Sequence, residues 1–283
     1  MRSNGPTPSS IRETSMTQSI PYWHVDAFSA KPFGGNQAAV MVMDEWLPDE
    51  TLVAIGGENL FAETAFVIPD ASGEADWELR WCTPTCEIAL CGHATLASGH
   101  VLLTHHEWGK GRDRVTFRTR KSGVLEVRRD GEGYALALPA IATEPAEHPQ
   151  ASALMGAEPQ SIHRSELGYN IMLYRDEAEV RALTPDIRGL ERLGADQFIA
   201  TAPGDNSDIA SRVFVPGGGV DEDSVTGSAH AALTPYWAAK LGRDAFTAHQ
   251  ASERGGDLTL RLDGDRAWLG GPCVTVVEGR FLL

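Results

Sequence analysis

Alternation of polar and apolar side chains is clearest over Trp77 to Cys82, where it indicates a strand with one buried face. Other short runs rich in Val, Ile, Phe or Tyr are bounded by Gly, Pro or Asp, as strands commonly are. In the first half of the chain these patterns predict strands over 22–28, 36–42, 63–68, 77–82, 115–119, 123–128 and 134–138.

Helical spacing of apolar and small side chains appears twice in the same half. Pro48 and Asp49 suit the first turn of a helix over 48–59. Gly92 to Leu103 predicts a buried helix that begins directly after Cys91. The second half repeats this plan, with predicted strands over 169–174, 198–202 and 211–215, helices over 176–183 and 227–241, and three closing strands up to Leu283.

Three landmarks of the first half return in the same order about half a chain later. Gly34-Gly35-Asn36 corresponds to Gly168-Tyr169-Asn170 (170 minus 36 is 134), Arg80–Pro84 to Arg212–Pro216 (212 minus 80 is 132), and Cys91–Ala94 to Thr226–Ala229 (226 minus 91 is 135). Each match alone is weak, but three nearly constant offsets indicate an internal duplication. Because ligand sites favour domain interfaces, we expect the site between the two copies.

The length of 283 residues is near the upper limit for a single hydrophobic core, which also favours two lobes. We predict a disordered tail over 1–20, an N-terminal lobe over 21–140, a Pro- and Glu-rich linker over 141–150 and a C-terminal lobe over 151–283. Strand-rich lobes that each wrap around one central helix make the expected fold class α+β.

Charge and composition restrict the possible partners. The 24 basic and 39 acidic side chains give a formal charge of −15, which repels phosphate backbones and disfavours nucleic acid. No apolar run is long enough to cross a bilayer, and residues 1–20 lack the apolar core of a secretory signal, so no membrane role is expected. Four cysteines are too few for a disulfide framework in so long a chain, which favours a reducing, cytoplasmic setting.

The turns Cys91-Gly92 and Thr226-Gly227 are the first candidate site. Each is expected to begin a helix, where free backbone N–H groups and the positive end of the helix dipole attract anions. If the two turns face each other across a cleft, they bind a small-molecule carboxylate from both sides. The alternative is ordinary helix capping, with Thr226 and Ser228 as the capping residues.

Glu63 is an acidic residue in an otherwise apolar segment, between Phe61-Ala62 and Ala65-Phe66. Partial removal of water by these neighbours would raise its pKa toward the range useful for acid/base catalysis. The alternative is a solvated acid without a function.

His93 and Asp223 are further candidates beside the two turns. Gly217 to Asp223 indicates a flexible acidic loop that leads into the second turn. Asp223 would then accept hydrogen bonds from a substrate amine, a hydroxyl or His93, or would simply belong to a solvated loop. His93 is either a packing residue at the helix start or a donor and proton relay.

The cysteines allow two interpretations. Cys82, Cys86, Cys91 and His93 have a spacing that superficially suggests zinc, but the first should lie within a strand and no second cluster completes a structural site, so no metal is expected. Cys91 has another possible role, because a thiol at a helix N-terminus has a lowered pKa and can act as a base toward carbon acids. Its counterpart in the second half, Thr226, is a poor base.

Several ordered motifs resemble the phenazine-biosynthesis PhzF-like family, over a stretch from about Tyr22 to the C-terminus. They are Val25-Asp26-Ala27-Phe28, Pro32-Phe33-Gly34-Gly35-Asn36, Glu63-Thr64, Thr83-Pro84-x-x-Glu87, Cys91-Gly92-His93-Ala94-Thr95 and Glu222-Asp223-Ser224-Val225-Thr226-Gly227-Ser228-Ala229. The resemblance implies the diaminopimelate epimerase-like fold, in which two pseudo-symmetric lobes each form a curved, mostly antiparallel sheet around a central helix.

The resemblance also implies a cofactor-independent isomerase that moves a proton between carbons of a small cyclic or unsaturated carboxylic or amino acid. In that family the glutamate matching Glu63 is the general acid/base, and one carboxyl group can remove a proton and return it elsewhere. The expected catalytic residues are Glu63, His93 and Asp223, and the expected substrate-binding residues are Cys91, Gly92, Thr226, Gly227 and Ser228. The resemblance also implies a homodimer.

Two alternatives stay open. Related racemases and epimerases use two cysteines, one at each helix N-terminus, whereas this chain has only Cys91 and carries Thr226 at the second. A Cys91-dependent epimerase or dehydratase of a proline-like amino acid is the first alternative. A non-catalytic protein that binds small carboxylates is the second.

Overall fold

The first half of the chain forms most of one lobe. The structure is a computed structural model that describes residues 18–283. All seven strands and both helices predicted for this half are present, with ends that differ by at most three residues. The elements are β1 (Ser19–Ala27), β2 (Asn36–Val42), α1 (Asp49–Asn59), β3 (Glu63–Pro69), β4 (Trp77–Cys82), β5 (Glu87–Ile88), α2 (Gly92–Thr104), the short 3-10 helix η1 (Glu107–Gly109), β6 (Arg114–Thr119), β7 (Val124–Asp130) and β8 (Gly133–Pro139).

The second half contains more short elements than its residue pattern predicts. Four strands rather than three close the chain, and the segment expected as a flexible acidic loop forms η2 and β14, because β14 pairs with β13. The elements are β9 (Glu144–Ala146), α3 (Pro149–Leu154), β10 (Ser161–Arg164), β11 (Tyr169–Leu173), α4 (Glu177–Ala182), α5 (Ile187–Glu191), β12 (Gln197–Pro203), β13 (Ile209–Val215), η2 (Pro216–Gly218), β14 (Val220–Asp223), α6 (Gly227–Leu241), β15 (Ala245–Gln250), β16 (Gly256–Asp263), β17 (Arg266–Gly271) and β18 (Cys273–Leu282).

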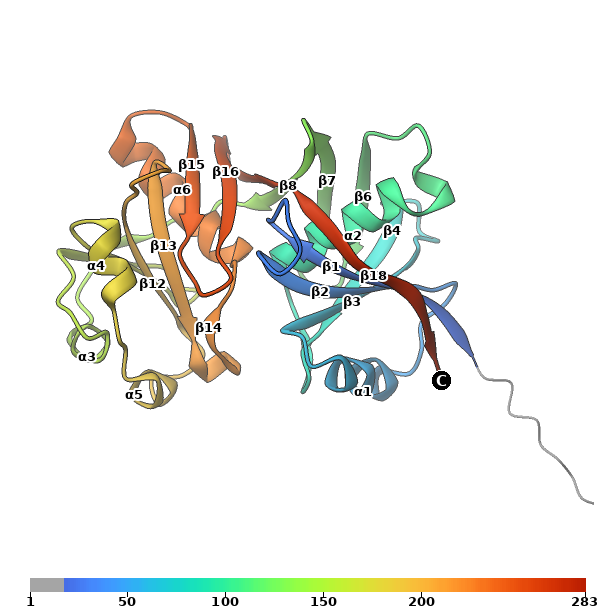
Figure 1. The fold of residues 1–283 in the computed structure, drawn as a ribbon, viewed down its shortest axis with the longest axis horizontal. Helices are drawn as coiled ribbons and strands as arrows, with labels where there is room; N and C mark the ends of the chain where they lie inside the picture. The colour runs from blue at the N-terminus through green and yellow to red at the C-terminus, as the bar shows by residue number, and fades with distance from the viewer. Residues whose placement is uncertain (1–17) are drawn as a thin grey trace, which may run out of the picture.

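Strand pairing repeats between the two halves (Figure 1). β2 runs parallel to β3 as β11 does to β12, and β4 runs parallel to β6 as β13 does to β15. The other pairings are antiparallel in both lobes, and one long, largely buried helix lies inside each, α2 in the first and α6 in the second. The topology confirms the internal duplication and the predicted architecture of two pseudo-symmetric lobes, each around a central helix.

Two strands pair far from their neighbours in the chain: β18, the last strand of the second half, lies in the first lobe's sheet, and β9, from the predicted linker, lies in the second lobe's sheet. β18 pairs with β1 over the whole length of β1, and β9 pairs with β10. The end of the predicted C-terminal lobe therefore lies in the first lobe's sheet, and the predicted linker over 141–150 contains β9 and the beginning of α3. The physical reason is that β1 and β10 each need a second partner for their backbone N–H and C=O groups, and residue pattern does not reveal which distant strand supplies it.

The predicted disordered tail over 1–20 lies mostly outside the described residues, which begin at 18. Ser19 and Ile20 are ordered in β1, because both pair with residues of β18. Within residues 18–283, no helix is both long enough and apolar enough to span a membrane.

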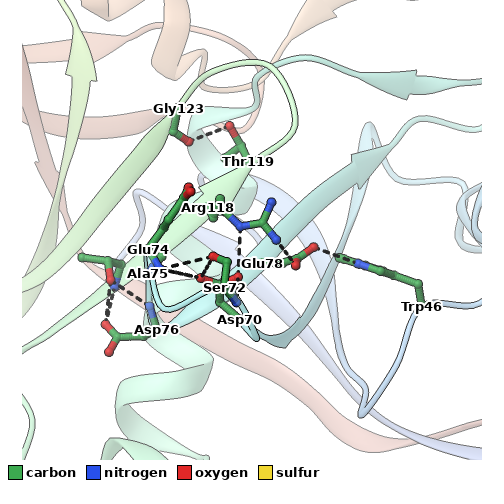
Figure 2. Close-up of polar contacts among 11 residues, drawn as sticks. Trp46, Asp70, Ser72, Glu74, Ala75, Asp76, Glu78, Arg118, Thr119 and Gly123 are labelled. Carbon is green, nitrogen blue, oxygen red and sulfur yellow. Dashed lines mark hydrogen bonds and ion pairs between the residues drawn. The ribbon is translucent and has the colours of Figure 1, made fainter.

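A cluster of polar side chains connects the turn between β3 and β4 to β6 through hydrogen bonds and ion pairs (Figure 2). Asp70 accepts hydrogen bonds from Ser72 Oγ at 2.6 Å and from Arg118 Nε at 2.9 Å. Arg118 also donates to Glu78, whose second carboxylate oxygen accepts from Trp46 Nε1 at 3.0 Å. The cluster lies at the beginning of β4 and supports the β4–β6 pairing, while the opposite end of β4 leads to the site described below.

Candidate functional site

The N-termini of the two central helices meet at the junction of the lobes. A Cβ atom placed on Gly92, the first residue of α2, would lie only 2.8 Å from the Cα of Gly227, the first residue of α6, and the reverse distance would be 2.9 Å. Only glycine at both positions allows this approach. The expectation that the two turns face each other is therefore confirmed.

A cavity of about 220 Å³ adjoins this contact. It is lined by all eight residues predicted for the site: Glu63, Cys91, Gly92, His93, Asp223, Thr226, Gly227 and Ser228. The remaining lining residues were not predicted, and they are Thr83, Ile88, Leu90, Gln197, Val215, Gly218 and Val220.

Glu63 stands at the beginning of β3 with its side chain 14% exposed. Its Oε2 lies 3.2 Å from His93 Nε2, without hydrogen-bond geometry to any group among the described residues. Burial raises the pKa of Glu63, and the neighbouring Asp223 carboxylate raises it further, while His93 and the Cys91 thiol lower it. The net direction is upward, as the apolar surroundings in the sequence predict.

His93 is 3% exposed and is oriented by Asn36. The Nδ2 atom of Asn36 lies 3.1 Å from His93 Nδ1, and it also donates to Asp223 Oδ1 at 2.7 Å and to the carbonyl oxygen of Val225 at 2.9 Å. Because the last two groups are acceptors only, this atom is the amide nitrogen, and Asn36 holds the Nδ1 edge of the imidazole while Nε2 lies toward Glu63.

Asn36 is buried and was not predicted as a site residue, although it belongs to a duplicated landmark. It lies at the beginning of β2 in the first lobe and contacts Asp223 in the second. The sequence signal that could have identified Asn36 is its position as a polar residue at the end of a Gly-rich turn that recurs in the second half.

Asp223 ends β14 and is hydrogen bonded through both carboxylate oxygens. One accepts from Asn36, and the other accepts from Thr226 Oγ1 at 2.6 Å. Gln250 completes this network, because its Oε1 accepts from the Thr226 backbone N–H at 2.8 Å and its Nε2 donates to the Asp223 carbonyl at 2.7 Å. Thr226 therefore uses its hydroxyl to hold Asp223 instead of capping α6.

Cys91 contradicts the expectation of a lowered pKa. Its side chain is 5% exposed, and burial raises the pKa of the thiol well above its usual range, with the nearby Glu63 carboxylate acting in the same direction. The helix N-terminus does not offset this loss of hydration. Cys91 Sγ lies 3.6 Å from His93 Nδ1, so the thiol packs beside the imidazole.

The structure brings together only part of the cysteine and histidine pattern whose spacing superficially suggests zinc. The ligand atoms of Glu63, Cys91 and His93 lie within 4.8 Å of one another, but neither Cys82 nor Cys86 belongs to that group. Cys82 is buried at the end of β4, where burial raises its pKa to about 11, and Cys86 is exposed.

Gln197 and Ser228 form part of the wall contributed by the second lobe. Gln197 Nε2 donates to Ser228 Oγ at 3.2 Å. Gln197 begins β12 as Glu63 begins β3, and it follows Asn170 by the same 27 positions (197 minus 170) by which Glu63 follows Asn36 (63 minus 36). Extending the duplication offset from Glu63 would have identified Gln197.

Comparison with known proteins places the chain in a family. A family model described as phenazine biosynthesis-like protein matches residues 25–279. An uncharacterized isomerase of Pseudomonas aeruginosa is 43% identical over 265 residues, which cover 93% of this chain and 99% of that protein.

Solved structures agree with this assignment. A phenazine biosynthesis protein of the PhzF family from Enterococcus faecalis is 37% identical, with a TM-score of 0.87 over 94% of this chain and 100% of that one. A hydroxyproline epimerase from Agrobacterium vitis, only 13% identical, has a TM-score of 0.61 over 94% of this chain and 93% of its own, and this likeness concerns the fold alone. The chain has the epimerase-like fold and belongs to the phenazine biosynthesis-like, or PhzF, family.

Proposed function

We propose that this protein is an isomerase that moves a proton between carbons of a small cyclic or unsaturated carboxylic or amino acid, with Glu63 as the general acid/base. The observation that carries the proposal is the environment of Glu63. Its carboxyl group is largely buried, has a raised pKa and lines a cavity beside two helix N-termini. The isomerase name of the Pseudomonas aeruginosa relative supports the reaction class.

The geometry suits a proton transfer by a single carboxyl group. The substrate carboxylate binds to the backbone N–H groups that begin α2 and α6, next to Gly92 and Gly227. Glu63 removes a proton from one carbon and returns it to another on the same face of the substrate, so the reaction is neutral in electrons. The His93 imidazole, whose Nε2 lies 3.2 Å from Glu63 Oε2, stabilises the ionised form of Glu63.

A Cys91-dependent epimerase is less well supported. The thiol has a raised pKa, and the residue at the equivalent turn is Thr226, whose hydroxyl is engaged by Asp223. A non-catalytic carboxylate-binding protein would keep the cavity without exchanging substrate hydrogens, and the following experiment separates it from the proposal.

Substitution of Glu63 by glutamine tests the proposal. Glu63→Gln keeps the shape of the side chain but removes the titrating acid, so proton transfer should fall by at least about 100-fold while binding persists. Proton NMR in D₂O measures the loss of carbon-bound hydrogens from a panel of cyclic unsaturated and proline-like amino acids.

Cys91→Ala is the matched variant at the neighbouring thiol. It should reduce exchange by less than about tenfold, because Cys91 donates no proton in the proposed reaction. If exchange survives Glu63→Gln but is abolished by Cys91→Ala, the Cys91 thiol and not Glu63 transfers the proton. Binding without exchange in the wild type would favour a binding protein.

A further inference from the structure

A second, larger cavity continues outward from the site. Its volume is about 680 Å³, compared with about 220 Å³ for the inner cavity. The two share Glu63, Thr83, Gly218 and Val220, so they are adjoining parts of one space between the lobes. An inner cavity of this size holds little more than a single small ring, whereas ligand sites usually exceed 300 Å³.

Leu60 forms part of the outer cavity in an unusual conformation. It follows α1 as its C-cap with a φ of 55°, and it is 79% exposed. Glycine and asparagine adopt this left-handed conformation with less strain than a leucine. A strained backbone that presents an apolar side chain to solvent gains nothing from packing, and such outliers gather at ligand sites.

Six of the fourteen residues that line the outer cavity are apolar, and its single cation, Arg188, is already paired. Arg188 lies 2.9 Å from Glu191 and 3.7 Å from Asp221 through its guanidinium nitrogens. An anionic ligand group would meet these carboxylates and Glu63 without a free positive charge. The apolar lining residues are Leu60, Phe61, Ala62, Pro84, Pro216 and Val220.

We propose, building on the proposed function, that the natural substrate carries an uncharged, apolar arm that binds in the outer cavity while its carboxylate and reacting carbons occupy the inner one. Leu60 then contributes to specificity by contacting the arm. The substrate is accordingly larger than an unsubstituted cyclic amino acid, and an arm that ends in a negative charge is disfavoured.

Binding of three probes tests this inference. They are cyclohex-1-ene-1-carboxylate, its 4-benzyl derivative, and the same derivative with a sulfonate on the benzyl ring. In titration calorimetry we expect the benzyl compound to bind at least about tenfold more tightly than the unsubstituted acid, because an apolar ring leaves water. The sulfonate should remove most of that gain.

Leu60→Asn tests the contact itself, and Leu167→Asn is the matched control. Asparagine has a similar size and tolerates the left-handed conformation, so the variant should fold and melt no lower than wild type. The ratio of the affinity of the benzyl compound to that of the unsubstituted acid should fall at least about fivefold, and the affinity of the unsubstituted acid should stay unchanged. Leu167 is 75% exposed and lines neither cavity, so its substitution should change nothing.

The inference fails if the benzyl compound binds no more tightly than the unsubstituted acid, or if its advantage survives Leu60→Asn. Its failure is distinct from failure of the proposed function. If exchange of substrate hydrogens depends on Glu63 but the benzyl compound binds no more tightly than the unsubstituted acid, only this inference is overturned. A Leu60-dependent preference without any exchange in the wild type would overturn only the proposed function.

Discussion

Glu63 holds a titrating carboxyl group where little water reaches it, and this position affects stability as well as chemistry. Burial raises its pKa above the ordinary 4.5, so the folded protein binds this proton more tightly than the unfolded chain does. The resulting stabilisation is fully present below the unfolded pKa and is lost as pH rises through the higher folded pKa.

Glu63→Gln should therefore become more stabilising, relative to wild type, as pH rises. Glutamine stays neutral, whereas the wild-type carboxyl group ionises in its buried site. The difference in melting temperature between the two proteins, measured at about pH 5 and at about pH 8, should be larger at the higher value. An equal or smaller difference at about pH 8 would show that the ionised carboxylate is well accommodated.

The cysteines should differ strongly in reactivity because only the thiolate is nucleophilic. Burial keeps Cys91 protonated and covered, whereas Cys86 is exposed. At neutral pH, iodoacetamide should label Cys86 at least about tenfold faster than Cys91, as peptide mass spectrometry would measure.

Cys86→Ser provides the control for that experiment, because it removes the fast site and leaves Cys91 in place. Rapid labelling of Cys91 in this variant would contradict the buried, protonated thiol. It would also restore support for a Cys91-dependent epimerase.

At the scale of elements, the two halves of the duplicated fold have different functional side chains at equivalent positions. β3 begins with Glu63 and β12 with Gln197, while α2 follows Cys91 and α6 follows Thr226. The two lobes thus place an acid and an amide at equivalent positions around one cavity. A single titrating carboxylate at one of these positions suits a reaction with one base better than a reaction with two.

The contact between α2 and α6 should be sensitive to a single methyl group. In Gly227→Ala the new Cβ would lie 2.9 Å from Gly92 Cα, so the helices must separate. We expect a loss of about 1–3 kcal/mol in the free energy of unfolding, measured by denaturant titration.

Gly279→Ala is the control for this substitution, because a Cβ at Gly279 in β18 meets nothing within 4 Å. It should change stability by less than about 0.5 kcal/mol. Equal effects of the two substitutions would mean that the helix contact does not require glycine.

At the scale of the whole molecule, the pairing of β18 with β1 and a partly buried ion pair hold the lobes together. Arg254, in the loop between β15 and β16, donates to Asp26 at 2.8 Å and to the carbonyl oxygens of Gly34 and Gly35 at 2.9 Å each. Asp26 is 1% exposed. This contact fixes the turn that leads directly to Asn36 and thus links the second lobe to the network around His93.

Arg254→Ala should therefore destabilise the protein by about 1–3 kcal/mol, since it leaves a buried carboxylate and two carbonyls with fewer donors. Thermal or denaturant unfolding measures the loss. Arg175→Ala removes an arginine from an exposed pair with Asp176 and should leave the stability almost unchanged. Similar losses would mean that the interlobe contact is as weak as a surface pair.

Much of the molecule follows from the sequence by itself. Alternation over Trp77 to Cys82 and small residues from Gly92 predict a strand and a buried helix, because these periodicities are local properties of the backbone. Constant offsets between landmarks predict the two lobes. They also direct attention to the turns at Gly92 and Gly227, although the direct contact of these two glycines is seen only in the structure.

Only the tertiary structure decided the rest, because it depends on which distant groups pack together. The open edges of β1 and β10 could pair with several strands. The local residue pattern does not reveal that β18 and β9 are the strands that do so. The raised pKa of Cys91 results from burial by the assembled lobes, which outweighs the local effect of the helix N-terminus. The orientation of His93 by Asn36 likewise exists only once β2 and α2, which are far apart in sequence, pack together.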